Sequence, residues 1–179
     1  MNREPSINDQ LWIHFLRGGG LASIIRNRPS GTDWKNNLYR FFTTTDDFNR
    51  ILEAHDLAKI VLRQYNMEYL VPLRDLVTQM ELQRVPVYDK QTDHTIHTIY
   101  LYLLGIWFFD NSAEFRKIYT EIESKSNYNE RFTPENFNIQ WIFAGLMHDI
   151  GYLFDNMALE TAMFRREIDK LVILDDRNT

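Results

Sequence analysis

The sequence predicts an all-α fold. Apolar residues recur at helical spacing through most of the 179 residues, which is the pattern of amphipathic helices. The one strand-like stretch, residues 85–88, is short and contains a proline, so it predicts no sheet. The chain shows neither a repeat nor a clear domain boundary. We therefore expect a single helical domain over residues 1–179.

The helices are expected in order along the chain, each with a recognisable start. The apolar spacing predicts them at residues 11–16, 34–42, 46–65, 73–82, 94–109, 113–122, 133–148 and 157–171. Ser6 or Asn8 starts the first, and the side-chain oxygens of residues 43–45 are expected to cap the third. Thr133, followed by a proline, is a strong start for the seventh. The polar stretch 123–131 is expected to be a loop.

Three consecutive glycines at residues 18–20 interrupt the first helix. Glycine-rich segments bind phosphate in some proteins, but this one lacks the Gly-Lys-Ser/Thr ending and the preceding apolar strand of such loops. We interpret the triplet as a turn between two short helices.

Composition and charge restrict the class of protein. The net charge of −5 argues against a general nucleic-acid or anionic-membrane surface. Cysteine is absent, which excludes disulfides, thiolate zinc sites and cysteine nucleophiles. The N-terminus has no apolar signal-peptide core, and the longest apolar run, residues 99–109, is shorter than the about 20 residues of a membrane span. We expect a cytoplasmic protein without membrane contact, and homo-oligomer formation stays open.

Two segments place metal-binding side chains at the ends of apolar helices. His94 and His97 open the helix that contains the apolar run, and their spacing of three puts them on one face. His148 and Asp149 close the helix that precedes them, and Gly151 permits that helix to end. Such polar groups are costly to bury unless they have partners. A bound cation between the two helix ends would supply one.

The His-Asp dipeptide also occurs earlier, at His55 and Asp56. Here it lies in the middle of a predicted helix, with His55 on the apolar stripe and no glycine after it. We interpret His55 as a hydrogen-bonded core or boundary histidine rather than a ligand.

Imidazole and carboxylate ligands together suit Mn, Fe, Zn, Ni or Co, and also Mg where carboxylates and water dominate. The segments DHTIHTIYLYLLG and FAGLMHDIGY, which carry these ligands, resemble the HD-domain superfamily of metal-dependent phosphohydrolases. The resemblance spans about residues 93–156. It implies a helical bundle of the HD-domain type, with an HD-like core over residues 91–179. The role of residues 1–90 is open.

The resemblance also assigns residues. It implies that His148 and Asp149 are paired metal ligands and that His97 or His94 is the first ligand. We prefer His97, because Thr98 and the apolar run follow it as in the family. His94 then lies one turn away as a phosphate contact or acid–base group, and Asp149 also orients water.

The family has a final aspartate on a later helix, and here the chain departs from the pattern. The available residues are Asp155, Asp169, Asp175 and Asp176. We take Asp169, on the predicted last helix, as the fourth ligand, although the ligand can also come from elsewhere or be missing. Arg165 and Arg166 can meet a phosphate or simply form a solvated helix face.

Two functions from different classes follow. The first is a phosphohydrolase that uses a divalent metal to act on a nucleotide or another phosphorylated small molecule. The second is a catalytically inactive HD-fold module that binds a nucleotide or a partner protein, which the missing final aspartate favours. A third interpretation makes the His148–Asp149 pair structural, with His148 capping its helix.

Overall fold

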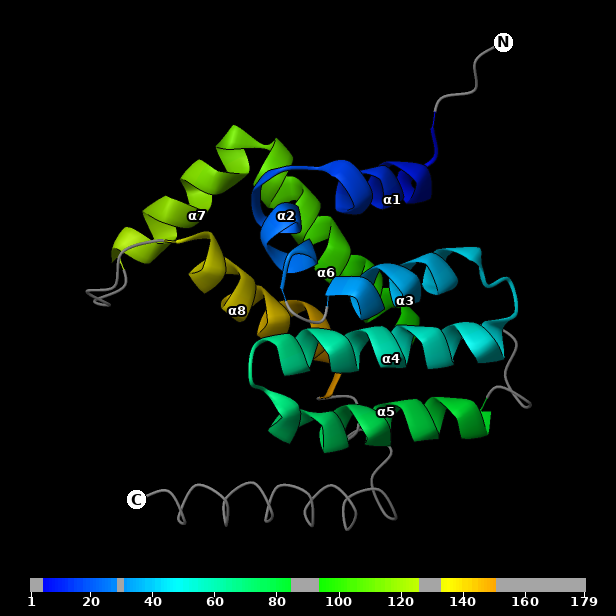
Figure 1. Cartoon of the computed structure of the whole chain (residues 1–179). Helices are drawn as coiled ribbons and strands as arrows, with labels where there is room; N and C mark the ends of the chain where they lie inside the picture. The colour runs from blue at the N-terminus through cyan, green and yellow to red at the C-terminus, as the bar shows by residue number, and fades with distance from the viewer. Residues whose placement is uncertain (1–4, 29–30, 85–93, 126–132, 151–179) are drawn as a thin grey trace.

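The computed structural model describes residues 5–28, 31–84, 94–125 and 133–150, and the regular secondary structure of this part of the chain is helical (Figure 1). It contains eight α-helices, a short 3-10 helix η1 and no strand, which confirms the all-α prediction for these residues. The helices are α1 Ile7–Arg17, α2 Gly20–Arg26, α3 Gly31–Thr43, α4 Asp47–Gln64, α5 Val71–Arg84, α6 His94–Asn111, α7 Ala113–Lys125 and α8 Pro134–Leu146, with η1 at Glu68–Leu70. The predicted strand-like stretch 85–88 and the predicted helix 157–171 lie outside the described residues.

Helix α6 lies at the centre of the fold. It packs against α1, α2, α4, α5, α7 and α8, and the figure shows the other helices arranged around it (Figure 1). Its apolar run explains this position, because a helix that is hydrophobic on nearly all sides is stable only when surrounded. Ile99, Tyr102, Leu103 and Ile106 are completely buried. One hydrophobic core therefore includes side chains from α1 through α8.

The helix starts agree with the sequence at two places and differ at a third. Ser6 caps α1 and Thr133 caps α8, as expected. The cap of α4 is Asp46, whose carboxylate accepts the backbone N–H of Asn49 at 2.8 Å. The prediction of a cap from residues 43–45 was wrong, because Thr43 ends α3 and its hydroxyl donates to the carbonyl of Tyr39 at 2.8 Å.

Two further expectations need correction. Helix α7 continues to Lys125, so the expectation of a loop over residues 123–131 was wrong for residues 123–125, and residues 126–131 lie outside the described part of the chain. The helical spacing of α4 also predicts that Phe48 and Leu52 face the core together with His55, but they are 45% and 37% exposed. The buried side of α4 instead includes Leu57, because α3, α5 and α6 all pack against this helix.

Helices α6 and α8 cross closely at two glycines. A Cβ atom on Gly105 would lie 1.9 Å from the ring of Trp141, and one on Gly145 would lie 3.2 Å from Cα of Tyr102. Gly105 meets the middle of α8, whereas Tyr102, closer to the start of α6, meets its end, so the two helices run antiparallel. The start of α6 therefore lies beside the residues that follow α8.

None of the described helices is long and apolar enough to cross a membrane. Their apolar residues are used instead to build the core around α6.

Candidate metal centre

The close crossing of α6 and α8 brings together the two segments that the sequence singled out. His94 and His97 lie in the first turns of α6. His148 and Asp149 lie just beyond α8, in a 3-10 turn over residues 148–150. The helix ends at Leu146 with Met147 as its C-cap, so the expectation that the pair closes the helix itself was wrong by two residues. Gly151 lies outside the described residues, and the helix ends before it.

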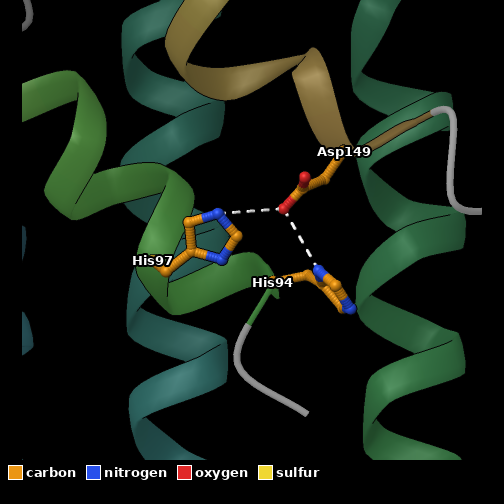
Figure 2. Close-up of side chains that lie close together, drawn as sticks. All are labelled: His94, His97 and Asp149. Carbon is orange, nitrogen blue, oxygen red and sulfur yellow. Dashed lines mark hydrogen bonds and ion pairs between the residues drawn. The ribbon is translucent and has the colours of Figure 1, made fainter. Parts of the chain in front are cut away.

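The carboxylate of Asp149 is the meeting point of the site. Its Oδ2 lies 3.1 Å from Nδ1 of His94 and 3.1 Å from Nε2 of His97. Figure 2 shows these two rings approaching the same oxygen from one side of α6. Asp149 is 2% exposed, whereas the His94 and His97 side chains are 34% and 39% exposed. The site therefore has a buried carboxylate, that of Asp149, on its inner side. The imidazole rings of His94 and His97, which are partly exposed to solvent, form its rim.

His148 joins the same cluster. Its Nε2 lies 2.9 Å from Oδ1 of Asp149 and 3.2 Å from Nε2 of His97. Its other nitrogen, Nδ1, lies 3.1 Å from the carbonyl oxygen of Gly145. A carbonyl oxygen only accepts, so Nδ1 of His148 carries the hydrogen in this contact. Because Nδ1 carries a hydrogen, the approach of Nε2 to a carboxylate oxygen is favourable only with a second proton on the ring or with a cation between the two atoms.

The donor atoms fit a metal ion. Two ligands about 2.1 Å from one ion and at right angles to each other are about 3.0 Å apart. The four contacts of Asp149 and His97 in the cluster, 2.9 to 3.2 Å, match that separation. The ligand atoms of His94, His97 and Asp149 all lie within 4.8 Å of one another. Donation of the second ring N–H to a backbone carbonyl, as at His148, is the usual support of a metal-binding histidine.

Two charged side chains of α5 lie behind the cluster, and the sequence did not single them out. Arg74 is completely buried and Glu81 is 3% exposed. Burial lowers the pKa of Arg74 to about 10, against the nearby carboxylates of Glu81 and Asp149, which raise it. Burial raises the pKa of Glu81, and its hydrogen bonds to Thr95 oppose that shift. The sequence signal that could have identified Arg74 and Glu81 is their spacing of seven residues. This spacing places both on the mainly apolar face of the helix.

The residues proposed from the sequence fall into two groups. The structure brings His94, His97, His148 and Asp149 together. His94, expected one turn away from the ligands, contacts the same carboxylate oxygen as His97. The remaining candidates lie outside the described residues: Asp155, Arg165, Arg166, Asp169, Asp175 and Asp176.

The earlier dipeptide lies elsewhere, as predicted. His55 is 7% exposed; its Nε2 lies 2.7 Å from Asp75 and its Nδ1 3.1 Å from the hydroxyl of Thr78. It is a hydrogen-bonded core histidine. Asp56 is half exposed and lies 3.9 Å from Lys59, so it takes no part in a cluster with His55.

Comparison with known proteins adds no family to this description. No protein-family model, no curated protein and no solved structure matches the chain. The function is therefore argued from the geometry of the centre and from the sequence motifs.

Proposed function

We propose that the protein is a metal-dependent phosphohydrolase of the HD type that acts on a nucleotide or another phosphorylated small molecule. The observation that carries the proposal is the convergence of His94, His97 and His148 on the buried carboxylate of Asp149. These residues come from two segments about fifty positions apart, so the fold and not local sequence assembles them.

The order of the ligands supports the HD type. A histidine opens one helix and a His-Asp pair follows a later one, which is the order that the resemblance implies. The two helices run antiparallel here, and this brings the two groups of ligands together. The family's final aspartate has its candidate in Asp169. His94 offers a second way to complete the site, because it gives four protein groups without a downstream aspartate.

The set of donor atoms restricts which metal ions we expect the site to bind. Three imidazoles and one carboxylate favour Mn, Fe, Co, Ni or Zn over Mg, which prefers oxygen ligands. When bound, such an ion supplies a Lewis acid and activates water for attack on phosphorus.

The protein groups have separate roles in this proposal. Asp149 provides the buried negative charge that holds the cation, and the hydrogen bond from His148 to Gly145 fixes the orientation of the His148 ring. His94 and His97 form the rim that solvent reaches, so substrate would arrive on that side. In the form of the site that Asp169 completes, His94 is not a ligand, and its imidazole is suited to move a proton to or from the reacting phosphate ester.

The test compares the two aspartates that follow a histidine. Wild type, Asp149→Asn and Asp56→Asn are purified and analysed for bound metal by elemental mass spectrometry. Each is then assayed with p-nitrophenyl phosphate and a set of nucleotides in the presence of Mn²⁺, Co²⁺ or Ni²⁺. We expect near-stoichiometric metal and phosphate release for wild type and for Asp56→Asn, and the loss of both for Asp149→Asn.

Two outcomes would overturn the proposal. Wild type that stays free of metal after incubation with excess ion removes the metal centre. Wild type that binds metal and a nucleotide but releases no phosphate favours the non-catalytic binding module instead.

A further inference from the structure

We propose that Arg74 is the positioning residue of the metal centre, joining the turn that carries His148 and Asp149 to the helix that carries His94 and His97. The inference rests on the proposed metal centre and assigns a structural support to it. It also gives α5, which belongs to the part of the chain without an assigned role, a direct part in the site.

The contacts of Arg74 reach both ligand-bearing segments. Its Nη1 donates to the carbonyl oxygen of Leu146 at 2.9 Å, two residues before His148. Its Nη2 donates to the hydroxyl of Thr98 at 3.1 Å, one residue after His97. The Thr98 hydroxyl in turn donates to the carbonyl of Thr95 at 2.9 Å. Arg74, Thr98 and Leu146 are all completely buried, so no water competes at their surface.

The chemistry of the guanidinium explains why arginine occupies this place. The last carbonyls of a helix lack partners within it and carry partial negative charge, which a cation satisfies. A planar guanidinium presents two donors in a fixed geometry, so it holds two acceptors at a set separation. A lysine offers a compact charge without that geometry. Burying the Arg74 guanidinium costs free energy. Holding the two ligand-bearing segments together is the role that we assign to it.

Glu81 supports the same helix two turns farther along α5. Both of its carboxylate oxygens accept the backbone N–H of Thr95 at 3.0 Å. Thr95 lies between His94 and His97, in the first turn of α6, where helix N–H groups need acceptors. Glu81 thus attaches α5 to the backbone of α6 between the two histidines, and Arg74 attaches it to the Thr98 side chain just after His97.

The experiment measures the binding of Co²⁺ alone, because its visible absorption bands report ligand geometry as well as occupancy. Arg74→Met and Arg74→Lys remove the two-acceptor link, and Thr98→Val removes the hydroxyl while keeping the branched shape. Thr98→Ser keeps the hydroxyl and is the conservative partner of Thr98→Val. Arg26→Met is the matched control, since Arg26 also donates to two acceptors, the backbone carbonyls of Phe15 and Gly18, away from the centre.

We expect Arg74→Met to weaken Co²⁺ binding about 10- to 100-fold, the usual effect of losing a support of a metal ligand, and to change the absorption bands. Arg74→Lys and Thr98→Val should shift both readouts in the same direction by less. Thr98→Ser and Arg26→Met should keep wild-type affinity and bands, even where urea unfolding shows that Arg26→Met is less stable.

The outcomes separate this inference from the proposed function. Wild type that binds no Co²⁺ contradicts both. Wild type that binds Co²⁺, together with folded Arg74→Met of equal affinity and equal bands, contradicts the role of Arg74 alone. If Arg74→Met does not fold, the threonine pair decides, because equal affinity and bands for Thr98→Val and Thr98→Ser would contradict the positioning link.

Discussion

The same dipeptide, histidine followed by aspartate, occurs twice in this protein with opposite outcomes. On α4, His55 is buried and bonds to Asp75 and Thr78 of α5, while Asp56 faces solvent. After α8, His148 and Asp149 contact each other at 2.9 Å; Asp149 also contacts both histidines of α6, and His148 contacts His97. The side chains are identical, so the difference lies in the backbone and the neighbours.

The backbone explains part of the difference. Within a continuous helix, adjacent side chains point about 100° apart, so His55 enters the core while Asp56 leaves it. His148 and Asp149 follow the C-cap of α8 in a short turn, and there the two side chains meet. The neighbours explain the rest, since α6 offers two further imidazoles and α5 offers a carboxylate and a hydroxyl. A His-Asp motif therefore indicates a metal site only where a helix ends beside other ligands.

Replacing the histidine of each dipeptide is expected to give the largest contrast. His148→Ala should weaken metal binding by more than about 100-fold, because a direct ligand is lost rather than a support. His55→Ala should keep the metal and lower the free energy of unfolding by about 1 to 3 kcal/mol, because Thr78 loses a buried hydrogen-bond partner. Metal titration and urea unfolding of both variants check this. Equal metal loss in both variants would contradict the comparison.

The two histidines of α6 sharpen the description of the centre. His97→Ala should weaken metal binding more than His94→Ala, because Nε2 of His97 lies within 3.2 Å of both Asp149 and His148. We expect at least about tenfold for His94→Ala, comparable to the loss of an outer contact. Competition titrations with a chromophoric chelator measure both. An unchanged affinity for His94→Ala would remove it from the ligand set.

The helix crossing that assembles the centre is tested at Gly105. Gly105→Ala should lower the free energy of unfolding by about 1 to 3 kcal/mol, because the new methyl group overlaps the ring of Trp141 and the helices must separate. Gly19→Ala is the matched control, since a Cβ there meets nothing within 4 Å, and it should change stability by less than about 1 kcal/mol. Urea unfolding followed by circular dichroism compares them. A larger effect at Gly19 would contradict the close crossing.

The smallest expected effect is a pH dependence that belongs to His55. Burial, followed by the charge of Lys59, lowers its pKa, and the carboxylate of Asp75 opposes this. The unfolded chain therefore binds a proton more readily below about pH 6.5. The contribution of His55 to the free energy of unfolding is therefore fully present above that pH and is lost as the pH falls. The unfolding free energy of wild type minus that of His55→Gln should fall between pH 7.5 and 5.5, by less than about 1.4 kcal/mol per pH unit. A difference independent of pH would contradict the lowered pKa.

Much of the helical structure was accessible from the sequence because it depends on local signals. Apolar spacing located the helices, and Ser6 and Thr133 marked two starts correctly. The predicted start of α4 was wrong because the hydroxyl of Thr43 already donates to a carbonyl in the last turn of α3. Local competition of this kind depends on where the preceding helix stops, which the spacing alone does not fix.

The candidate site was accessible in part. The segments around His97 and His148 were identified because they combine ligands with unusually apolar helices. Arg74 and Glu81 were missed because their partners, at Leu146, Thr98 and Thr95, are distant in sequence. The choice between His94 and His97 stayed open for a related reason. Both lie on one face of α6, and only the position of the α8 turn decides what each contacts.

The central position of α6 has a consequence for how the protein is made. Helices α1, α2, α4 and α5 precede α6 in the chain and pack against it as well as against their other neighbours, so the parts of their apolar faces that contact α6 stay uncovered until residues 94–111 have been synthesised. Exposed apolar surface of this kind favours aggregation and chaperone binding during synthesis. A ribosome that pauses before α6 would therefore hold a nascent chain in need of protection, whereas the same pause after α6 would leave most of the core already closed.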